Sequence, residues 1–219
     1  MIEQITGEIK GVLFDYGGVM TTPVRDSIAA WIQADGIKPE SFTTVLQEWL
    51  GRYVDTGTPI HRLELGELPV EEFDRLLAER LETYAGTPVD PVGVLKRLFA
   101  GMGPDPEMWT LARDLRDAGV RVALLSNSWG NFYDHGPIEE TFEVAVISED
   151  VRLRKPDPAI FELVLDKLDL DAAECVFIDD AEPNIIGARD LGLVAVLHED
   201  AATTRATLAR HIPALGGAR

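Results

Sequence analysis

The sequence has little cysteine and no long apolar run, and both absences limit where the protein can work. Cys175 is the single cysteine among 219 residues, which excludes an intramolecular disulfide and suits a reducing compartment. No apolar run approaches the roughly 20 residues that a membrane-spanning helix needs. Residues 1–10 also lack the apolar core of a signal peptide. We therefore expect a cytoplasmic protein without a membrane partner.

Positive charge is also scarce. Lys and Arg number 20 against 38 Asp and Glu, so the formal net charge is −18. Because nucleic-acid backbones and anionic membrane surfaces attract basic proteins, we expect no nucleic-acid partner and no membrane partner. The remaining composition, 46% hydrophobic and 26% charged, is ordinary for a folded globular protein. It does not specify an oligomeric state.

Short apolar segments alternate with helical patterns along most of the chain. Such alternation predicts an α/β fold, with a doubly wound, Rossmann-like parallel sheet. The predicted strands are Ile9–Asp15, Val120–Ser126, Val144–Ile147, Cys175–Asp179 and Leu193–Leu197. Asp105-Pro106 and Asp157-Pro158 each place an N-cap acid before a proline, which predicts a helix start. Further helices are expected from about Pro183 to Leu191 and from Ala201 to Ala209.

The segment after the first strand lacks strand patterns and carries helical apolar stripes instead. Four stripes are present, centred on Trp31, on Leu46, on Leu77 and on Leu98. They predict a helical subdomain inserted after the first strand, placed over that strand's polar end as a cap. We expect the α/β core to comprise residues 1–20 and 100–219, and the cap to comprise residues 21–99.

Polar residues follow three predicted strands, where open α/β sheets place their ligand sites. They are Asp15, the pair Ser126-Asn127 and the pair Asp179-Asp180, and Lys155 precedes a helix start. Taken singly, Asp15 and Ser126-Asn127 suit turn or capping roles, and Lys155 suits a solvated loop. Two adjacent carboxylates at a buried strand end repel each other, and a bound cation such as Mg²⁺ relieves that repulsion.

Taken together and in this order, the four elements resemble the motifs of the haloacid dehalogenase superfamily. The motifs are Asp15-Tyr16-Gly17-Gly18-Val19, Ser126-Asn127, Lys155 and Asp179-Asp180. Ser126-Asn127-Ser128-Trp129, Lys155-Pro156-Asp157-Pro158 and Asn184 look most similar to the N-terminal phosphatase group of soluble epoxide hydrolases. The resemblance covers essentially the whole chain, including the helical insertion.

The resemblance implies a Mg²⁺-dependent phosphatase that hydrolyses a small phosphorylated metabolite. Asp15 would be the nucleophile and form an aspartyl-phosphate. Ser126 and Asn127 would bind the phosphoryl group, and Lys155 would neutralise its charge and orient Asp15. Asp15, Asp180 and the carbonyl of Gly17 would hold Mg²⁺, with Asp179 supporting the metal site.

Gly17 departs from the superfamily pattern. Typical phosphatases of the superfamily have a second Asp here, which protonates the leaving group and later activates water. General acid/base catalysis contributes roughly 10²–10⁴-fold, so its loss predicts a slower enzyme. The enzyme could instead favour good leaving groups, take the proton from His61 or His135, or bind without turnover. Metal-independent dehalogenases also lack this Asp, but Asp179-Asp180 argues for a cation and therefore for phosphate.

Overall fold

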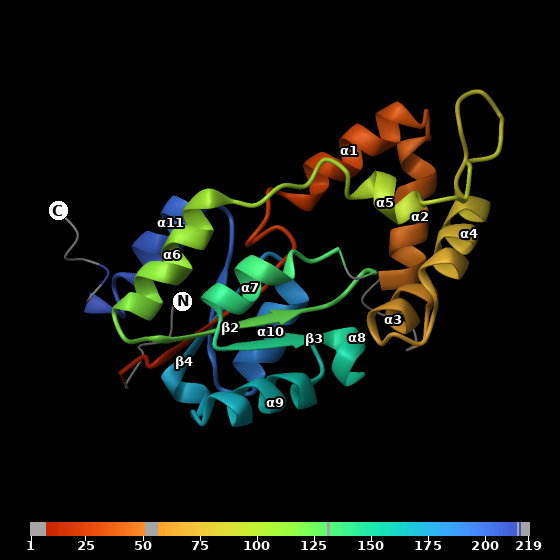
Figure 1. Cartoon of the computed structure of the whole chain (residues 1–219). Coiled ribbons are helices and arrows are strands. Elements are labelled where there is room, and N and C mark those ends of the chain that lie inside the picture. The colour runs from red at the N-terminus through yellow and green to blue at the C-terminus, as the bar shows by residue number, and fades with distance from the viewer. Residues whose placement is uncertain (1–7, 51–56, 131, 214, 216–219) are drawn as a thin grey trace.

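The computed structural model describes residues 8–50, 57–130, 132–213 and 215. Its centre is a five-stranded parallel sheet (Figure 1) in the order β3-β2-β1-β4-β5. The strands are β1 (Gly11–Phe14), β2 (Arg121–Ser126), β3 (Val144–Ile147), β4 (Cys175–Asp179) and β5 (Val194–Leu197). This order, in which β1 lies centrally and the chain crosses over it, is the Rossmann-like arrangement, so the predicted fold class is confirmed. All five predicted strands are present, with ends shifted by at most two residues.

Successive strand residues face opposite sides of the sheet, and helices cover both sides. The side chains of Val12, Phe14 and Leu124 join one core with α6 (Pro106–Asp117), α7 (His135–Thr141) and α11 (Ala201–Leu208). On the other side, Leu13 and Phe177 join a core with α9 (Pro158–Leu168) and α10 (Glu182–Asp190). Because both faces are buried, the strands are continuously apolar instead of alternating.

N-cap hydrogen bonds confirm the two helix starts that were predicted from Asp-Pro pairs. The carboxylate of Asp105 accepts hydrogen bonds from the backbone N–H groups of Glu107 and Met108, and α6 follows. The carboxylate of Asp157 accepts one from Ala159, and α9 follows. The short elements α7, α8 (Ser148–Val151) and η1 (Ala172–Glu174) were not predicted.

The described residues of the insertion after β1 form five helices, and Figure 1 shows them grouped at one end of the sheet. They are α1 (Val24–Ala34), α2 (Pro39–Leu50), α3 (Pro59–Glu64), α4 (Val70–Arg80) and α5 (Val94–Leu98), here called the helical unit. Their apolar faces form a third core that includes Trp31, Trp49 and Phe73. The sequence predicted four of these helices and missed α3, because six residues are too short to show a periodic stripe.

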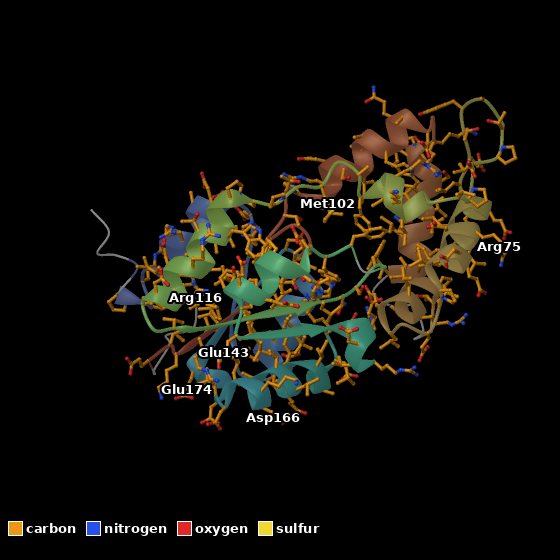
Figure 2. The ribbon with its side chains drawn as sticks, viewed as in Figure 1. Arg75, Met102, Arg116, Glu143, Asp166 and Glu174 are labelled. Atoms are coloured by element: carbon orange, nitrogen blue, oxygen red, sulfur yellow. The ribbon has the colours of Figure 1, made fainter. Side chains whose placement is uncertain are left out.

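Two chain segments that run side by side connect the helical unit to the sheet. Thr21 and Pro104 form an antiparallel bridge, and the indole N–H of Trp109 donates to the carbonyl of Met20 over 2.8 Å. In contrast, Glu143 and Glu174 lie at the opposite end of the sheet from the helical unit (Figure 2). No helix in the described part of the chain is long and apolar enough to span a bilayer.

Candidate active site

Asp15 lies at the end of β1 that faces the helical unit. Its backbone N–H donates to the carbonyl of Ile178 over 2.9 Å, which fixes it between the ends of β1 and β4. The following turn closes when Val19 and Met20 donate to the carbonyl of Tyr16. Gly18 has a φ of +76°, and a Cβ there would lie 2.4 Å from an Oδ2 atom of Asp180. This position therefore requires glycine, both for its backbone and for the close approach of Asp180.

Lys155 is buried at the centre of the site, with 1% of its side chain exposed. Its ammonium group donates to Asp15 Oδ1 at 2.7 Å, to Asp179 Oδ2 at 2.7 Å and to the carbonyl of Leu125 at 2.9 Å. These three acceptors use all three protons of the ammonium group. Burial alone would lower the pKa of Lys155, but the charges of Asp15 and Asp179 reverse the effect and raise it. Lys155 is therefore a permanent cation that holds Asp15 in place.

The acidic residues around Lys155 differ in how their oxygens are occupied. Burial raises the pKa of Asp15 to about 7; the charge of Lys155 lowers it in part, and that of Asp179 raises it further. Asp179 is fully buried and accepts from Lys155, from the backbone N–H of Ala181 and from the amide of Asn184. Asp180 is exposed as a whole residue, but its carboxyl group is partly desolvated by its neighbours; this desolvation, followed by the charge of Asp179, raises its pKa.

These three carboxylates form a group that can hold a metal ion. Asp15, Asp179 and Asp180 each offer an oxygen, and the three oxygens lie within 4.8 Å of one another. Carboxylate oxygens are hard donors of the kind that Mg²⁺ prefers. The donor set therefore fits a hard divalent cation. Because Asp179 already has several hydrogen-bond donors, Asp15 and Asp180 are better placed as direct ligands than Asp179.

The loop after β2 brings Ser126 and Asn127 to the same place. The hydroxyl of Ser126 is buried and lies 3.0 Å from the hydroxyl of Tyr133, which donates to it. Burial raises the pKa of Tyr133, so this phenol stays protonated at neutral pH. Asn127 binds the backbone of Lys155 through both ends of its amide, at 2.9 and 3.1 Å. Asn127 therefore positions the lysine loop as well as facing the site.

A cavity of about 300 Å³ lies between the sheet ends and the helical unit. Asp15, Gly17, Ser126, Asn127, Lys155 and Asp180 all line it, so the structure brings these predicted site residues to one space. Asp179 is not among the lining residues because it lies beneath Lys155. Sequence reasoning missed Tyr133 and Glu64, which also line the cavity. Tyr133 stands in a loop and Glu64 in a short helix, so neither belongs to a recognisable pattern.

Glu64, at the end of α3, connects the helical unit to the site loops. One carboxylate oxygen accepts from the indole N–H of Trp129 at 2.9 Å, and the other accepts from Arg154 at 2.5 Å. Its carbonyl accepts from the hydroxyl of Ser148, which in turn accepts from the N–H of Ser128. Glu64 therefore contacts both the loop after β2 and the loop that carries Lys155.

The two histidines considered as proton donors do not line the cavity. His61 is buried in α3, where burial and the charge of Arg154 lower its pKa, and its Nδ1 atom lacks a hydrogen-bond partner among the described residues. The ring of His135 lies 6.2 Å from that of Tyr133. Tyr133 lines the cavity and His135 does not, so the hydroxyl of Tyr133 is the better placed of these groups.

The comparison with protein families agrees with this arrangement. A family model described as haloacid dehalogenase-like hydrolase matches residues 9–192. The chain belongs to the haloacid dehalogenase-like hydrolases. The matched range begins just before β1 and extends past α10, so it contains Asp15, Ser126, Lys155 and the Asp179-Asp180 pair. This membership makes the chain a hydrolase.

Individual relatives of this haloacid dehalogenase-like chain include proteins named as phosphatases. A sesquiterpene phosphatase from Aspergillus oryzae is 28% identical and aligns with 89% of this chain and 92% of its own length. Bifunctional epoxide hydrolase 2 from Sus scrofa is 30% identical and aligns with 89% of this chain but 37% of its own length. The predicted resemblance to soluble epoxide hydrolases is therefore confirmed over the shared part.

Solved structures show the same fold. A haloacid dehalogenase family enzyme from Bacteroides thetaiotaomicron, crystallised with magnesium and inorganic phosphate, superposes with a TM-score of 0.63. The match covers 88% of this chain and 96% of the other, at 24% identity.

Proposed function

We propose that the chain is a Mg²⁺-dependent phosphatase that hydrolyses a small phosphate monoester through an aspartyl-phosphate on Asp15. The observation that carries this proposal is the geometry of Asp15, whose carboxylate bonds to Lys155 and lies beside Asp180 in a cavity. Family membership supports a hydrolase, and relatives named as phosphatases support phosphate as the group removed. We also propose that the helical unit, predicted as residues 21–99, caps this site.

The reaction requires two displacements at phosphorus. An oxygen of Asp15 attacks phosphorus, the bond to the ester oxygen breaks, and the leaving alkoxide takes a proton from water. Water then attacks the phosphorus of the acyl-phosphate, which regenerates Asp15 and releases inorganic phosphate. Lys155 orients Asp15 and supplies positive charge, while the hydroxyl of Ser126 donates to a phosphoryl oxygen. Tyr133, which bonds to Ser126, fixes the direction of that hydroxyl.

The metal has a defined place in this proposal. Asp15, Asp180 and the carbonyl of Gly17 would hold Mg²⁺, and Asp179 would support the site by positioning Lys155 and Asn184. When bound, Mg²⁺ would offset the repulsion between the carboxylates and an anionic phosphate.

An assay with an aryl phosphate tests the function. Turnover is expected with Mg²⁺, and it is expected to disappear with a chelator and in Asp15→Asn. Asp166→Asn is the matched control, because Asp166 lies on the exposed side of α9, far from the cavity (Figure 2). Undiminished turnover in Asp15→Asn, or turnover that does not respond to the chelator, would overturn the proposal.

Gly17 supports a second candidate, which is binding of a phosphorylated ligand with slow or absent release. The cavity side of this turn carries no side chain at residue 17, so no carboxylate is present there to activate water. This candidate predicts that Asp15 becomes phosphorylated once, without further turnover. A burst of one leaving group per protein, followed by no steady-state release, would distinguish it from the phosphatase.

A further inference from the structure

The cavity has two chemically different halves. The half at the strand ends carries the polar groups that engage phosphate in the proposed function. The other half is hydrocarbon: it includes Val24 and Ile28 of α1, Phe42 and Leu46 of α2, Phe99 after α5 and Phe132 after β2. Met102 belongs to the same wall, and Figure 2 shows it at the junction between the helical unit and the sheet. A ligand that reaches from Asp15 into this space meets apolar surface.

This apolar half is not fully covered by the protein itself. Ile28, Leu46, Phe99 and Met102 are partly exposed, and Phe132 is 44% exposed. An apolar surface that remains open inside a cavity is a feature of ligand-binding sites, because water is a poor partner for it. The wall is built from two helices, the segment after α5 and one loop, so it is a concave surface and not a scatter of single residues.

The described lining of the cavity has no free cation for a second anionic group. Among its described lining residues Lys155 is the only cation, and its three protons already bond to Asp15, Asp179 and Leu125. Of the described residues in the helical unit, Glu64 is the one ionisable group that lines the cavity, and Arg154 and Trp129 occupy its two oxygens. A bisphosphate, a nucleotide or a phosphorylated acid would therefore bury a charge without a partner, which is costly.

We propose that the substrates are phosphate monoesters of apolar alcohols, with a hydrocarbon chain or ring lying against this wall. The inference rests on the proposed phosphatase function and specifies its leaving group. A volume of about 300 Å³ corresponds to roughly ten water-sized groups of about 30 Å³ each. The five heavy atoms of a phosphate take about half of these ten groups, which leaves room for about five or six carbons before a chain reaches the cavity mouth.

A series of linear alkylphosphonates, from methyl to octyl, tests this substrate class. Phosphonates retain the anionic head but have no ester bond, so they report binding without hydrolysis. They are used as competitive inhibitors of acetyl phosphate hydrolysis by the Mg²⁺-loaded protein. Each methylene that becomes buried is expected to lower the inhibition constant about fourfold, which corresponds to about 0.8 kcal/mol per CH₂. The decrease should end at about six carbons.

A matched polar ligand and two variants sharpen the test. Dihydroxybutylphosphonate is expected to bind roughly 10–100-fold more weakly than butylphosphonate, because its hydroxyls lose water without gaining partners. Leu46→Gln and Ile28→Gln are expected to reduce the gain per methylene. Leu76→Gln is the control, since Leu76 is partly buried in the helical unit but does not line the cavity.

The outcomes separate this inference from the function on which it rests. Acetyl phosphate has no apolar body, so its Asp15-dependent hydrolysis reports the phosphatase alone. If acetyl phosphate is hydrolysed but the inhibition constants do not change with chain length, the substrate class is wrong and the phosphatase stands. Stronger inhibition by dihydroxybutylphosphonate than by butylphosphonate would also overturn the proposed substrate class. If acetyl phosphate is not hydrolysed, the proposed function fails. The unaltered protein alone decides these outcomes, whether or not each variant folds.

Discussion

Gly17 and Gly18 are neighbours in the turn after β1, but they are constrained very differently. At Gly18 the positive φ and the contact with Asp180 leave no room for a side chain. At Gly17 the φ is not in the left-handed region, and an added Cβ would lie 3.6 Å from a methyl group of Val24, which is an ordinary contact. A side chain would therefore fit at residue 17, so steric exclusion does not explain why an acid is missing there.

Restoring that acid gives the first prediction. Gly17→Asp is expected to raise kcat/KM, which reports the step that phosphorylates Asp15, about 10²-fold for an alkyl phosphate, the lower end of general acid/base effects, because an alkoxide needs a proton to leave. The gain should be much smaller with acetyl phosphate, since acetate leaves without protonation. Steady-state kinetics on both substrates measures the difference.

Gly17→Asn adds the same bulk without a transferable proton and serves as the control. Equal rates for Gly17→Asp and the unaltered protein would show that another group, with Tyr133 the best placed, already supplies the proton.

The pKa of Asp15 gives a prediction about metal affinity. Burial raises this pKa to about 7 in the metal-free protein, so the neutral form predominates below pH 7. A ligand carboxylate must be ionised to bind a cation, so Mg²⁺ has to displace this proton at lower pH. We expect the dissociation constant for Mg²⁺ to rise about tenfold for each pH unit below 7 and to level off above it.

Isothermal titration calorimetry in two buffers with different ionisation enthalpies measures that proton release directly. About one proton per Mg²⁺ is expected at pH 6 and close to none at pH 8.5. An affinity that is constant across this range would contradict a shared role of Asp15 in binding both the proton and the metal.

At the scale of elements, α3 connects the helical unit to two loops around the site through polar contacts. Glu64 ends this helix, and its carboxylate joins Trp129 on the loop after β2 to Arg154, the residue before Lys155. The side chains of Glu64 and Arg154 are 5% and 21% exposed, so solvent screens this ion pair only in part. The position of α3 and the position of the Lys155 loop are therefore linked through one carboxylate.

Glu64→Gln tests that link. The amide preserves the shape and one acceptor but removes the charge opposite Arg154, so we expect the free energy of unfolding to fall by about 1.5–3 kcal/mol. Urea denaturation measures this change. Glu67→Gln is the control, because Glu67 is exposed just beyond the same helix and should change stability by less than about 0.5 kcal/mol. Equal effects of the two substitutions would show that the Glu64 contacts contribute nothing specific.

The same elements show which features the sequence could predict. The buried strands and the capped helices α6 and α9 have local causes, an apolar run or an Asp-Pro pair, and those causes are visible in the residues themselves. The strand-end residues Asp15 and Asp180 could be grouped because parallel strands end at one edge. Glu64 could not be, since its importance arises from a contact with Arg154, which is far away in the chain. Tyr133 could not be either, because it reaches Ser126 from a loop that has no periodic pattern. The cavity wall was hidden for a related reason: Leu46 and Phe99 belong to apolar stripes, and periodicity does not distinguish a stripe that packs from one that faces a ligand.

At the scale of the whole molecule, the net charge of −18 affects any measurement of metal binding. Excess negative charge destabilises a compact state through self-repulsion, and every added salt screens it. Mg²⁺ will therefore stabilise this protein in two ways. It screens the repulsion between negative charges, and it binds at the cluster formed by the carboxylates of Asp15, Asp179 and Asp180. Only the binding depends on particular residues. A measurement of binding therefore needs a control salt at the same ionic strength.

We accordingly predict that Mg²⁺ raises the melting temperature more than NaCl does at the same ionic strength. At 100 times the dissociation constant, binding contributes about 2.7 kcal/mol to the free energy of unfolding. Asp180→Asn is expected to remove the difference between the two salts, because it withdraws a ligand oxygen. Asp150→Asn, which changes an exposed aspartate on α8 outside the carboxylate group, should retain the difference while losing the same formal charge. If both variants retain it, the stabilisation comes from bulk charge, and the carboxylate group at the end of β1 and β4 is not a metal site.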